Sequence, residues 1–272
     1  MEVRYLERVM IVGQLVSVIA TVHNLEQYLP RLLTALRHQS YQDLDIILVD
    51  DGSHDQSPVI LARAATQDQR IRLLPLTPAG GVAAARNAGL ELVKGDYVIF
   101  VDGGDWMGRD YVRHFVEGIE ASDADVVANP YIVQRGGAET VVGEGQLPRL
   151  MTQDEFMAAV VAPTGAIRGY LWNKMFRRQI ITAHNLQFDE DLDAMEDELF
   201  TVRYAIHAEC FYFGAHPDYR YGVRSGSLTT SNDTLSLLGQ QLTAVRAINR
   251  TIADARARER PTWRTRRLLE KG

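Results

Sequence analysis

"LVSVIATVHNLEQYLPRLLTALRHQSYQDLDIILVDDGS", residues 15–53, predicts a strand, a helix and a second strand in succession. Residues 15–22 form a short apolar run rich in β-branched side chains, which is typical of a strand buried on both faces. Residues 25–39 place leucines at helical spacing, and residues 45–51 form a second apolar run. A strand, a helix and a strand of these lengths indicate two parallel strands joined by a right-handed crossover.

The same alternation continues to residue 102. Residues 57–67 and 81–95 have helical patterns, the second closed by Gly95, and residues 71–76 and 96–102 have strand patterns. The sequence therefore predicts an α/β fold, a mostly parallel sheet flanked by helices. Such sheets bind ligands beyond the carboxyl ends of their strands, and there this chain carries His23-Asn24, Asp50-Asp51 and the stretch from Asp102 to Asp105.

After about residue 110 the alternation is less regular. We expect helices over 109–121, 152–161 and 196–209, strands over 124–134, 210–214 and 219–224, and an exposed, turn-rich segment over 135–146. Thr152 and Glu155 form a capping-box pattern at the start of the second of these helices. From Leu235 the pattern is helical to near the end of the chain, with a break expected at Pro261. The absence of repeats and low-complexity linkers favours one domain with an irregular second half.

Composition and termini narrow the class of protein. The 272 residues are 46% hydrophobic, enough for a buried core. The apolar stretch from Val9 to Val22 is interrupted by polar residues and is shorter than the roughly 20 residues that a membrane span needs. Residues 1–10 mix both charge signs and precede no small-residue cleavage site, unlike a signal peptide. Cys210 is the single cysteine and has no partner for an internal disulfide. We therefore expect a cytoplasmic protein.

The usual phosphate-binding motifs are missing. No G-x-G-x-x-G follows the first strand and no G-x-x-x-x-G-K-[ST] occurs, which argues against a dinucleotide oxidoreductase and a P-loop enzyme. The second strand instead ends in Asp50-Asp51-Gly52-Ser53, where an acid can accept from a base imide or a ribose hydroxyl, and His23 can stack on a base. The same four residues also suit a turn and a helix cap.

Five motifs follow one another along the chain. They are residues 16–57, "GGVAAARNAGLELVKGDYVIFVDGGDW" (80–106), "WNKMFRR" (172–178), "EDELF" (196–200) and "YRYGVRSGSLTTS" (219–231). In this order they resemble glycosyltransferase family 2, the inverting GT-A enzymes, and in particular bacterial transferases of capsule, teichoic-acid and related polysaccharides. The resemblance implies a hexosyltransferase-type enzyme with a GT-A fold, a nucleotide-diphosphate-sugar donor, commonly a UDP-sugar, and a divalent metal, Mn²⁺ or Mg²⁺. It leaves the acceptor open among a glycan, a lipid-linked intermediate, a small molecule and a protein.

The resemblance also divides the chain. Residues 1–14 are an N-terminal tail, and residues 15–231 are the GT-A domain, with a nucleotide-binding half (15–109) and an acceptor and catalytic half (110–231). Residues 232–272 are a helical, basic segment. The chain has a formal net charge of −6, yet from Arg246 onward nine basic residues face three acidic ones, a balance of +6 that leaves −12 elsewhere. A solvated helix, contact with an anionic membrane surface near a lipid-linked acceptor, and nucleic-acid binding all fit this segment, the last least well because the remainder is acidic.

The family's functional residues are carried over by matching motifs. Asp197, with Glu196 beside it, matches the catalytic base. The matches to donor-binding positions are Thr21, His23, Asn24, Asp51, Arg86, Asn87, Asp102, Arg224 and Ser227. The matches to the metal-binding stretch are Asp102 and Asp105. Trp106, Trp172 and Lys174 are candidates for contacts with sugar or acceptor.

Two positions depart from the family pattern. The family's "LDSDDW" is "VDGGDW" here, so Gly104 stands where an aspartate generally ligates the metal, and Ala79 replaces a frequent asparagine. Two hypotheses follow. Either Asp105 takes the metal in a shifted geometry that the glycines permit, or the metal affinity is low and the enzyme is weak or inactive.

Inversion requires a base that removes the acceptor proton while the diphosphate leaves on the opposite face. Asp197 has this role by resemblance, although "EDE" also suits the first turn of any helix. Core packing is the competing use of Trp106 and Trp172. Among other functions, a sugar-nucleotide pyrophosphorylase is disfavoured because its glycine-rich N-terminal loop is missing. A degenerate nucleotide-sugar-binding protein is the alternative that Gly104 suggests.

Overall fold

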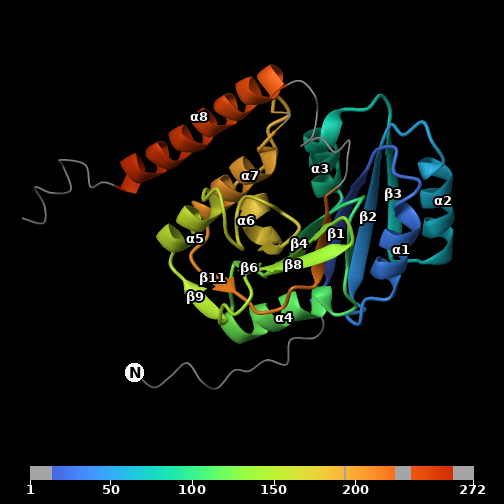
Figure 1. The fold of residues 1–272 in the computed structure, drawn as a ribbon, viewed down its shortest axis with the longest axis horizontal. Coiled ribbons are helices and arrows are strands. Elements are labelled where there is room, and N and C mark those ends of the chain that lie inside the picture. The colour runs from blue at the N-terminus through green and yellow to red at the C-terminus, as the bar shows by residue number, and fades with distance from the viewer. Residues whose placement is uncertain (1–13, 193, 224–233, 260–272) are drawn as a thin grey trace, which may run out of the picture.

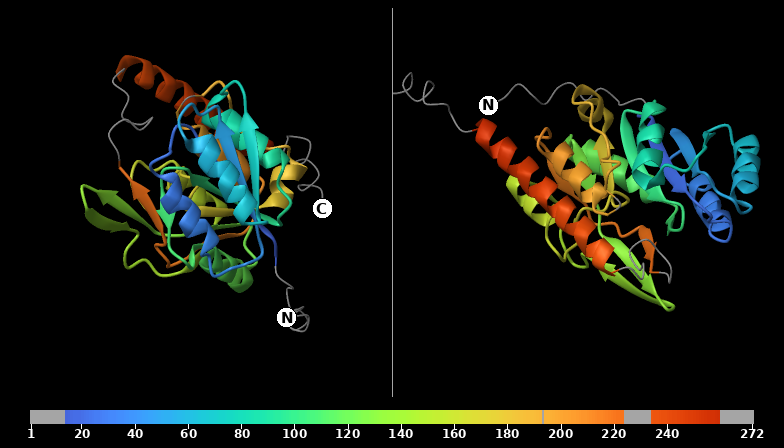
Figure 2. Two further views of the ribbon diagram at one scale, coloured as in Figure 1. Left: turned by 90° about the vertical axis from the view of Figure 1, so that its right-hand side faces the viewer. Right: turned by 90° about the horizontal axis from the view of Figure 1, so that it is seen from above.

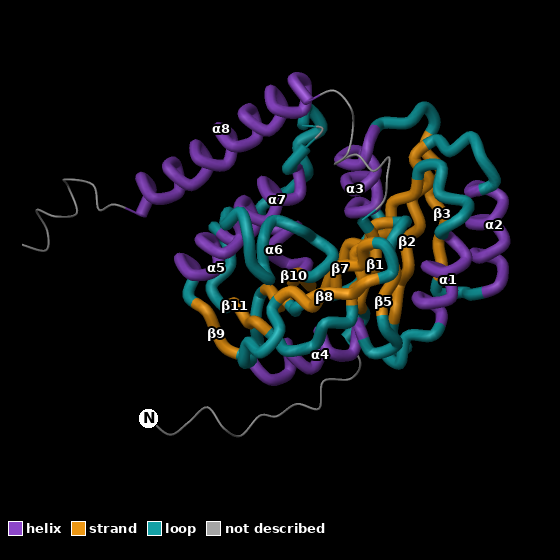
Figure 3. The backbone as a smooth tube through the Cα atoms, in the orientation of Figure 1, coloured by secondary structure: helices purple, strands orange, loops and turns teal. Residues whose placement is uncertain are grey.

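An eight-stranded sheet forms the centre of the computed structural model, which describes residues 14–192, 194–223 and 234–259 (Figures 1 and 3). In spatial order its strands are β3 (Ile71–Leu76), β2 (Leu44–Asp51), β1 (Val16–Val22), β4 (Tyr97–Asp102), β10 (Lys174–Arg177), β6 (Val126–Ala128), β11 (Phe211–Phe213) and β9 (Arg149–Met151). Strands β1 to β4 are mutually parallel, as are β6 and β11, whereas β10 and β9 run antiparallel to their neighbours. The predicted α/β fold with a mostly parallel sheet is confirmed.

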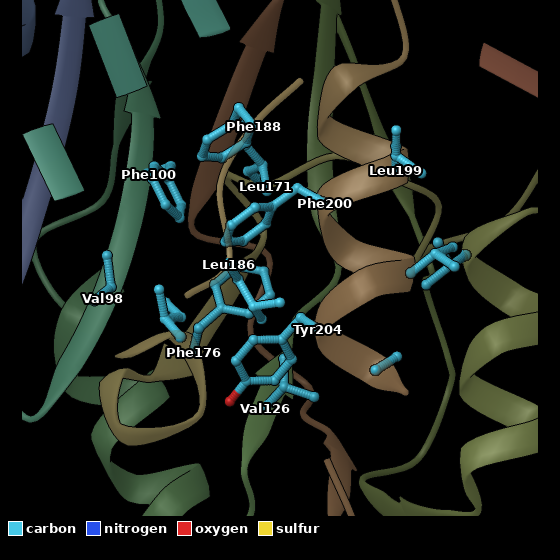
Figure 4. Close-up of a cluster of buried hydrophobic side chains, with 14 of the residues drawn as sticks. Val98, Phe100, Val126, Leu171, Phe176, Leu186, Phe188, Leu199, Phe200 and Tyr204 are labelled. Atoms are coloured by element: carbon cyan, nitrogen blue, oxygen red, sulfur yellow. The ribbon is translucent and has the colours of Figure 1, made fainter. Parts of the chain in front are cut away.

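Helices cover both faces of this sheet. The helices are α1 (Leu29–Arg37), α2 (Ser57–Gln67), α3 (Gly81–Glu91), α4 (Tyr111–Ser122), α5 (Gln153–Val160), α6 (Arg178–Ala183), α7 (Glu196–Ala205) and α8 (Thr234–Glu259). Val18 and Ala20 of β1 pack into one apolar cluster with α1, α2 and α4, while Ile19 packs into a second cluster with α3, α5, α6, α7 and α8. Because side chains alternate along a strand, one buried strand supplies both clusters. Figure 4 shows part of the second cluster, around Phe100, Phe176 and Phe200.

A second, four-stranded sheet lies over the carboxyl end of β4. Its order is β5 (Trp106–Met107), β12 (Tyr219–Gly222), β7 (Tyr131–Arg135) and β8 (Ala138–Val142). Strands β7 and β8 form a hairpin, and β12 pairs with β5 and β7. The stretch that follows Asp102 therefore enters this small sheet through β5, which places β12 beside the metal-motif residues.

Two predictions about local structure were wrong, and a third, the turn-rich segment, was incomplete. Residues 124–134 are not one strand: the chain leaves the large sheet after β6, passes Asn129-Pro130 and enters the small sheet as β7, because proline has no N–H to continue the ladder. The turn-rich segment contains β8. The third helix ends at Glu91 rather than Gly95. A Cβ at Gly95 would lie 2.5 Å from the Ser17 backbone nitrogen, so close backbone approach accounts for this glycine.

The capping box at Thr152 and Glu155 is confirmed, since Thr152 Oγ1 accepts from the Glu155 N–H and the Glu155 carboxylate accepts from the Thr152 N–H. Helix α8 lies along the outer side of the α5 and α7 layer (Figure 2). None of the helices in the described ranges is long and apolar enough to span a bilayer. Arg256 of α8 lies 3.9 Å from Asp154, and membrane contact through the basic segment, whose residues 260–272 are outside the described ranges, stays a prediction.

Candidate active site at the carboxyl ends of the central strands

The strand register gathers the predicted site residues at one edge of the sheet. Thr21 lies opposite Asp102 in the pairing of β1 with β4, and Val22 lies opposite Asp50 in the pairing of β1 with β2. The loops that leave these strands are therefore neighbours. This is the edge at which the sequence predicted a ligand site.

Hydrogen bonds join the loop after β1 to the loop after β2. The His23 Nδ1–H donates to the Asp51 carbonyl oxygen at 2.6 Å, and the Asn24 N–H donates to Ser53 Oγ at 2.9 Å. Asn24 has a φ of +53°, a left-handed conformation that asparagine tolerates better than most residues. The exposed His23 ring thus has a fixed orientation, and its stacking on a base stays a prediction.

The Asp51 carboxylate caps helix α3. Its two oxygens accept from the Gly80 N–H at 2.7 Å and the Gly81 N–H at 3.0 Å, and the residue is 6% exposed. A carboxylate at a helix N-terminus satisfies unpaired N–H groups and favours the helix dipole. The capping role that the sequence left open is therefore present, at the start of α3. The role of Asp51 in binding a base or ribose stays a prediction.

Arg86 on α3 joins two carboxylates from distant parts of the chain. Its Nη1 donates to Glu196 Oε1 at 2.6 Å, and its Nη2 donates to Asp102 Oδ1 at 3.1 Å. The Arg86 side chain is 7% exposed, whereas that of Asp102 is 37% exposed. Burial lowers the pKa of Arg86, but the charges of Asp102, Glu196 and Asp197 outweigh burial and raise it overall. One buried guanidinium therefore balances the acidic side of the site, and Asp102 keeps a solvent-facing part.

Helix α7 begins directly at the predicted base. Met195 precedes it with a φ of +62°, a strained conformation for a residue that has a Cβ. This turn brings Glu196 to Arg86 and leaves Asp197 half-buried beside it. Burial and the negative charge of Glu196 raise the pKa of Asp197, Arg86 lowers it, and the net value is about 7. A carboxylate with a pKa near neutral pH is suited to general-base catalysis.

Both carboxylate oxygens of Asp105 are bound to strand β12. Oδ2 accepts from the Tyr219 hydroxyl at 3.0 Å and Oδ1 accepts from the Gly222 N–H at 3.0 Å, and the residue is 2% exposed. The same Tyr219 hydroxyl accepts from the Asp102 N–H at 3.2 Å. Asp105 thus fastens the small sheet to the end of β4, and its buried carboxylate has little exposed surface at which a metal ion could bind.

The site offers few ligands for a divalent ion. Gly104 has no side chain, Asp105 is buried, and within the described ranges no group of three metal-ligating side chains forms at this edge. The part-exposed Asp102 carboxylate remains. A single carboxylate suits Mg²⁺ or Mn²⁺ only when a diphosphate and water complete the shell. These residues fit an ion that arrives with the donor and do not form a cage for an ion alone.

Asn87 was predicted to bind the donor, but the structure directs its amide elsewhere. Its Nδ2 donates to the Phe188 carbonyl oxygen at 3.0 Å and to Glu190 Oε1 at 2.8 Å, and its Oδ1 accepts from the Phe188 N–H at 2.8 Å. These bonds fix the loop that carries Phe188, which stacks on Phe200 in the core (Figure 4). Asn87 is 9% exposed, so its role in this structure is to hold that loop.

Trp172 and Lys174 are buried rather than available to a sugar. Trp172 is 3% exposed and stacks on Tyr219 with ring centroids 4.6 Å apart, which favours the core-packing alternative. The Lys174 ammonium is 0% exposed and donates to the carbonyl oxygens of residues 167, 168 and 170. Burial lowers the pKa of Lys174 to about 7, against the charges of Asp197 and Glu198. This lysine holds the loop beside α7.

Trp106 is the aromatic candidate that borders a hollow. The Arg31 guanidinium lies over its ring, 3.0 Å from the centroid, and both residues line this hollow with Gly104 and Gly137. Arg31 and Tyr219 were not predicted to belong to the site, although both lie within the quoted motifs, because each contacts its partner from more than 70 residues away. Arg224 and Ser227 lie outside the described residues.

The amino-acid sequence matches a known family model and resembles known proteins. The family model described as "Glycosyl transferase family 2" matches residues 17–183. The chain is 30% identical over 217 residues to the putative glycosyltransferase EpsH of Bacillus subtilis, covering 78% of this chain and 62% of EpsH. It is 24% identical over 248 residues to the poly(ribitol-phosphate) beta-N-acetylglucosaminyltransferase TarS of Staphylococcus aureus, covering 88% of this chain and 41% of TarS. The chain thus spans less than two thirds of the length of these relatives.

A solved structure has the same fold. The crystal structure of residues 1–349 of S. aureus TarS in complex with UDP superposes with a TM-score of 0.71 at 21% identity, covering 88% of this chain and 65% of that one. At this identity the superposition establishes the fold and carries no residue roles. It places the eight-stranded and four-stranded sheets within the GT-A architecture.

Proposed function

The chain belongs to glycosyltransferase family 2, and from this premise we propose that it is an inverting transferase that moves a sugar from a nucleotide-diphosphate donor, a UDP-sugar, to an acceptor hydroxyl. The observation that carries the proposal is the Arg86 bridge. It holds Asp102, at the end of β4, and Glu196, at the start of α7, on either side of one guanidinium, with Asp197 next in the chain. Binding of UDP by TarS supports the choice of nucleotide.

In the proposed reaction Asp197 is the general base. Its carboxylate takes the proton of the acceptor hydroxyl as that oxygen forms a bond to the anomeric carbon. The bond from this carbon to the diphosphate oxygen breaks on the opposite face, and the electron pair leaves with the nucleoside diphosphate. The pKa of about 7 supports this role, because at neutral pH a large fraction of Asp197 is unprotonated while the carboxylate remains a competent base.

Asp102 is proposed to act where the donor diphosphate and its metal ion bind. Its part-exposed carboxylate faces the edge of the sheet while Arg86 fixes one oxygen. When a divalent ion is bound together with the diphosphate, it supplies charge neutralisation for the leaving group. Asp102 would contribute the protein ligand, Thr21 and His23 would flank the nucleoside, and Trp106 beside its hollow would face the acceptor.

Calorimetric titration with UDP, with GDP as the control nucleotide, tests the proposal in the presence and absence of Mn²⁺. We expect UDP to bind, GDP to bind at least tenfold more weakly, and UDP binding to strengthen with Mn²⁺. The same affinity for UDP with and without Mn²⁺ would indicate a metal-independent transferase. Failure of both nucleotides to bind would contradict the proposal.

A degenerate nucleotide-sugar-binding protein is the second candidate, and Gly104 favours it, since this glycine removes a usual metal ligand. Binding alone does not separate the two candidates. Release of UDP from UDP-sugars, by hydrolysis or by transfer to added acceptors, does so. A protein that binds UDP-sugar with Mn²⁺ and releases no UDP over hours, across acceptors of several classes, would support the binding protein.

A further inference from the structure

A cluster of metal-ligating side chains lies outside the candidate active site. His114 and Glu117 are one turn apart on α4, and His216 lies in the loop between β11 and β12. One ligand atom from each of these three residues lies within 4.8 Å of the other two. Residues three apart on a helix share a face, so the two α4 side chains point toward the same loop. Two imidazoles and one carboxylate form a ligand set that zinc uses in proteins.

Asp218 holds His114 in the orientation that a metal ligand needs. The His114 Nδ1 lies 2.6 Å from Asp218 Oδ2. A carboxylate accepts, so Nδ1 is the donor, and in the neutral imidazole Nε2 then has the lone pair that can ligate a metal. Asp218 is itself fixed, because its carbonyl oxygen accepts from the Gly108 N–H at 2.8 Å. A histidine ligand oriented by a carboxylate through its other nitrogen is a recurrent arrangement at protein metal sites.

The two histidine rings are stacked, with centroids 3.6 Å apart and planes 12° from parallel. Parallel rings cannot direct their in-plane lone pairs at one ion, so one ring must turn. His216 is exposed and lies in a loop, whereas His114 is half-buried and bound to Asp218. Ligation therefore requires rotation of the His216 side chain, and no change in α4 is needed.

We propose that His114, Glu117 and His216 bind a divalent transition-metal ion of the zinc class, with Asp218 as the residue that positions His114. Three protein ligands leave a fourth position for water. Mixed imidazole and carboxylate ligands favour Zn²⁺, Co²⁺ or Ni²⁺ over Mg²⁺, which prefers oxygen. This site is separate from the donor-associated ion proposed at Asp102.

The ion would fasten the loop before β12 to helix α4. Strand β12 begins at Tyr219, directly after Asp218, and Tyr219 contacts both Asp102 and Asp105. The ion would thus reduce the mobility of β12, the strand that is hydrogen-bonded to Asp102 and Asp105. Its expected effect is on the stability of the small sheet, with no part in bond making or breaking.

Co²⁺ absorption and Zn²⁺ calorimetry on the full chain test the site, without nucleotide, after chelator treatment and removal of any histidine tag. We expect one Co²⁺ per chain with visible d–d bands, and displacement by Zn²⁺. His216→Gln and Glu117→Gln should each weaken Zn²⁺ binding at least tenfold, and Asp218→Asn should weaken it by tenfold or more. Because His216 and Glu117 are exposed, these variants should fold normally, as circular dichroism can verify.

A second stacked histidine pair provides the matched control. His184 and His207 stack with centroids 3.7 Å apart, and within the described ranges no carboxylate completes a ligand group with them. His184→Gln should leave Zn²⁺ affinity unchanged, and so should Asp102→Asn, which separates this site from the donor site. Absence of Co²⁺ binding at millimolar concentration would overturn the proposal. Binding that survives His216→Gln or is lost in His184→Gln would also overturn it.

Discussion

Arg86 Nη1 and Glu196 Oε1 lie 2.6 Å apart although 110 residues separate them in the sequence. The same guanidinium donates to Asp102, so α3 links the end of β4 to the start of α7. One buried cation thus stands among three acids, Asp102, Glu196 and Asp197. Arg86 is the cation that hydrogen-bonds two acids of the candidate site, and its charge lowers the pKa of the proposed base.

Replacement of Arg86 by methionine should destabilise the fold. The variant leaves Glu196, which is 8% exposed, without its partner, and an unpaired buried charge typically costs about 3–5 kcal/mol. Urea unfolding at pH 8 measures the loss, and at pH 5 the loss should be smaller because the acids can take up protons. Arg72→Met is the matched control, since Arg72 also pairs with a buried aspartate, Asp45, but away from the site. An equal loss at both pH values for Arg86→Met would contradict this account.

Asp197→Asn should abolish transfer, because an amide cannot take up the proton of the acceptor hydroxyl. The affinity for UDP should stay within about twofold of the unmodified protein. In the unmodified protein the rate constant should rise with pH through about 7, the pKa of Asp197, and then level off. Steady-state rates from pH 5 to 9 check this. Glu198→Gln, one residue further along the helix, should remain active. A fully active Asp197→Asn variant would exclude Asp197 as the base.

The same substitution should stabilise the protein at high pH. The folded-state pKa of about 7 lies above the unfolded value of about 3.9, so the folded state holds this proton more tightly. The stability that this proton confers is complete below about pH 4 and is lost as the pH rises through 7. Asp197→Asn should therefore raise the free energy of unfolding by about 2–4 kcal/mol at pH 8 and by almost nothing at pH 4. Urea unfolding at the two pH values measures this difference, and a gain of the same size at both would contradict the assigned pKa.

Gly104→Asp should restore a metal ligand. The φ of Gly104 is not positive, so a residue with a Cβ can occupy this position without left-handed backbone strain. With UDP present, we expect Mn²⁺ affinity to increase at least tenfold in calorimetry. Gly103→Ala is the control: a Cβ there would lie 2.6 Å from the Thr21 carbonyl oxygen, so this variant should lose stability without gaining affinity. Unchanged Mn²⁺ affinity in Gly104→Asp would mean that the site does not use an ion at this position.

The sequence pattern located the strands and helices of the first half and, in the second half, helices α4, α5 and α7 and strands β11 and β12, but it did not locate the other short strands of the second half. Strands β1 to β4 have six to eight residues, long enough for a pattern, whereas β5, β9 and β10 have two to four and show none. The motif order located Asp102, Glu196 and Asp197 in one site. It could not show that Asp51 caps α3, that Asn87 holds the Phe188 loop, or that His114 stacks on His216. Each of these contacts joins residues that only the tertiary fold brings together.

The Tyr219 hydroxyl distinguishes the two roles considered for Asp105. Burial and the charge of Asp105 raise the pKa of Tyr219 well above its usual value, so the hydroxyl stays a donor to Oδ2. If Asp105 is structural, Tyr219→Phe should lower the free energy of unfolding by about 1–3 kcal/mol, the cost of a buried group left unsatisfied. Mn²⁺ affinity in the presence of UDP should then stay within twofold.

If Asp105 instead ligates the ion, loss of the hydroxyl frees its oxygen and Mn²⁺ affinity should rise, while Asp105→Asn should lower it severalfold. Calorimetry on both variants decides between the two roles. Tyr221→Phe is the control, because Tyr221 also lies on β12 and stacks near Trp172 but has no hydrogen bond to Asp105 among those described. We expect the structural outcome, since both oxygens of Asp105 already have partners on β12 and the carboxylate is almost wholly buried.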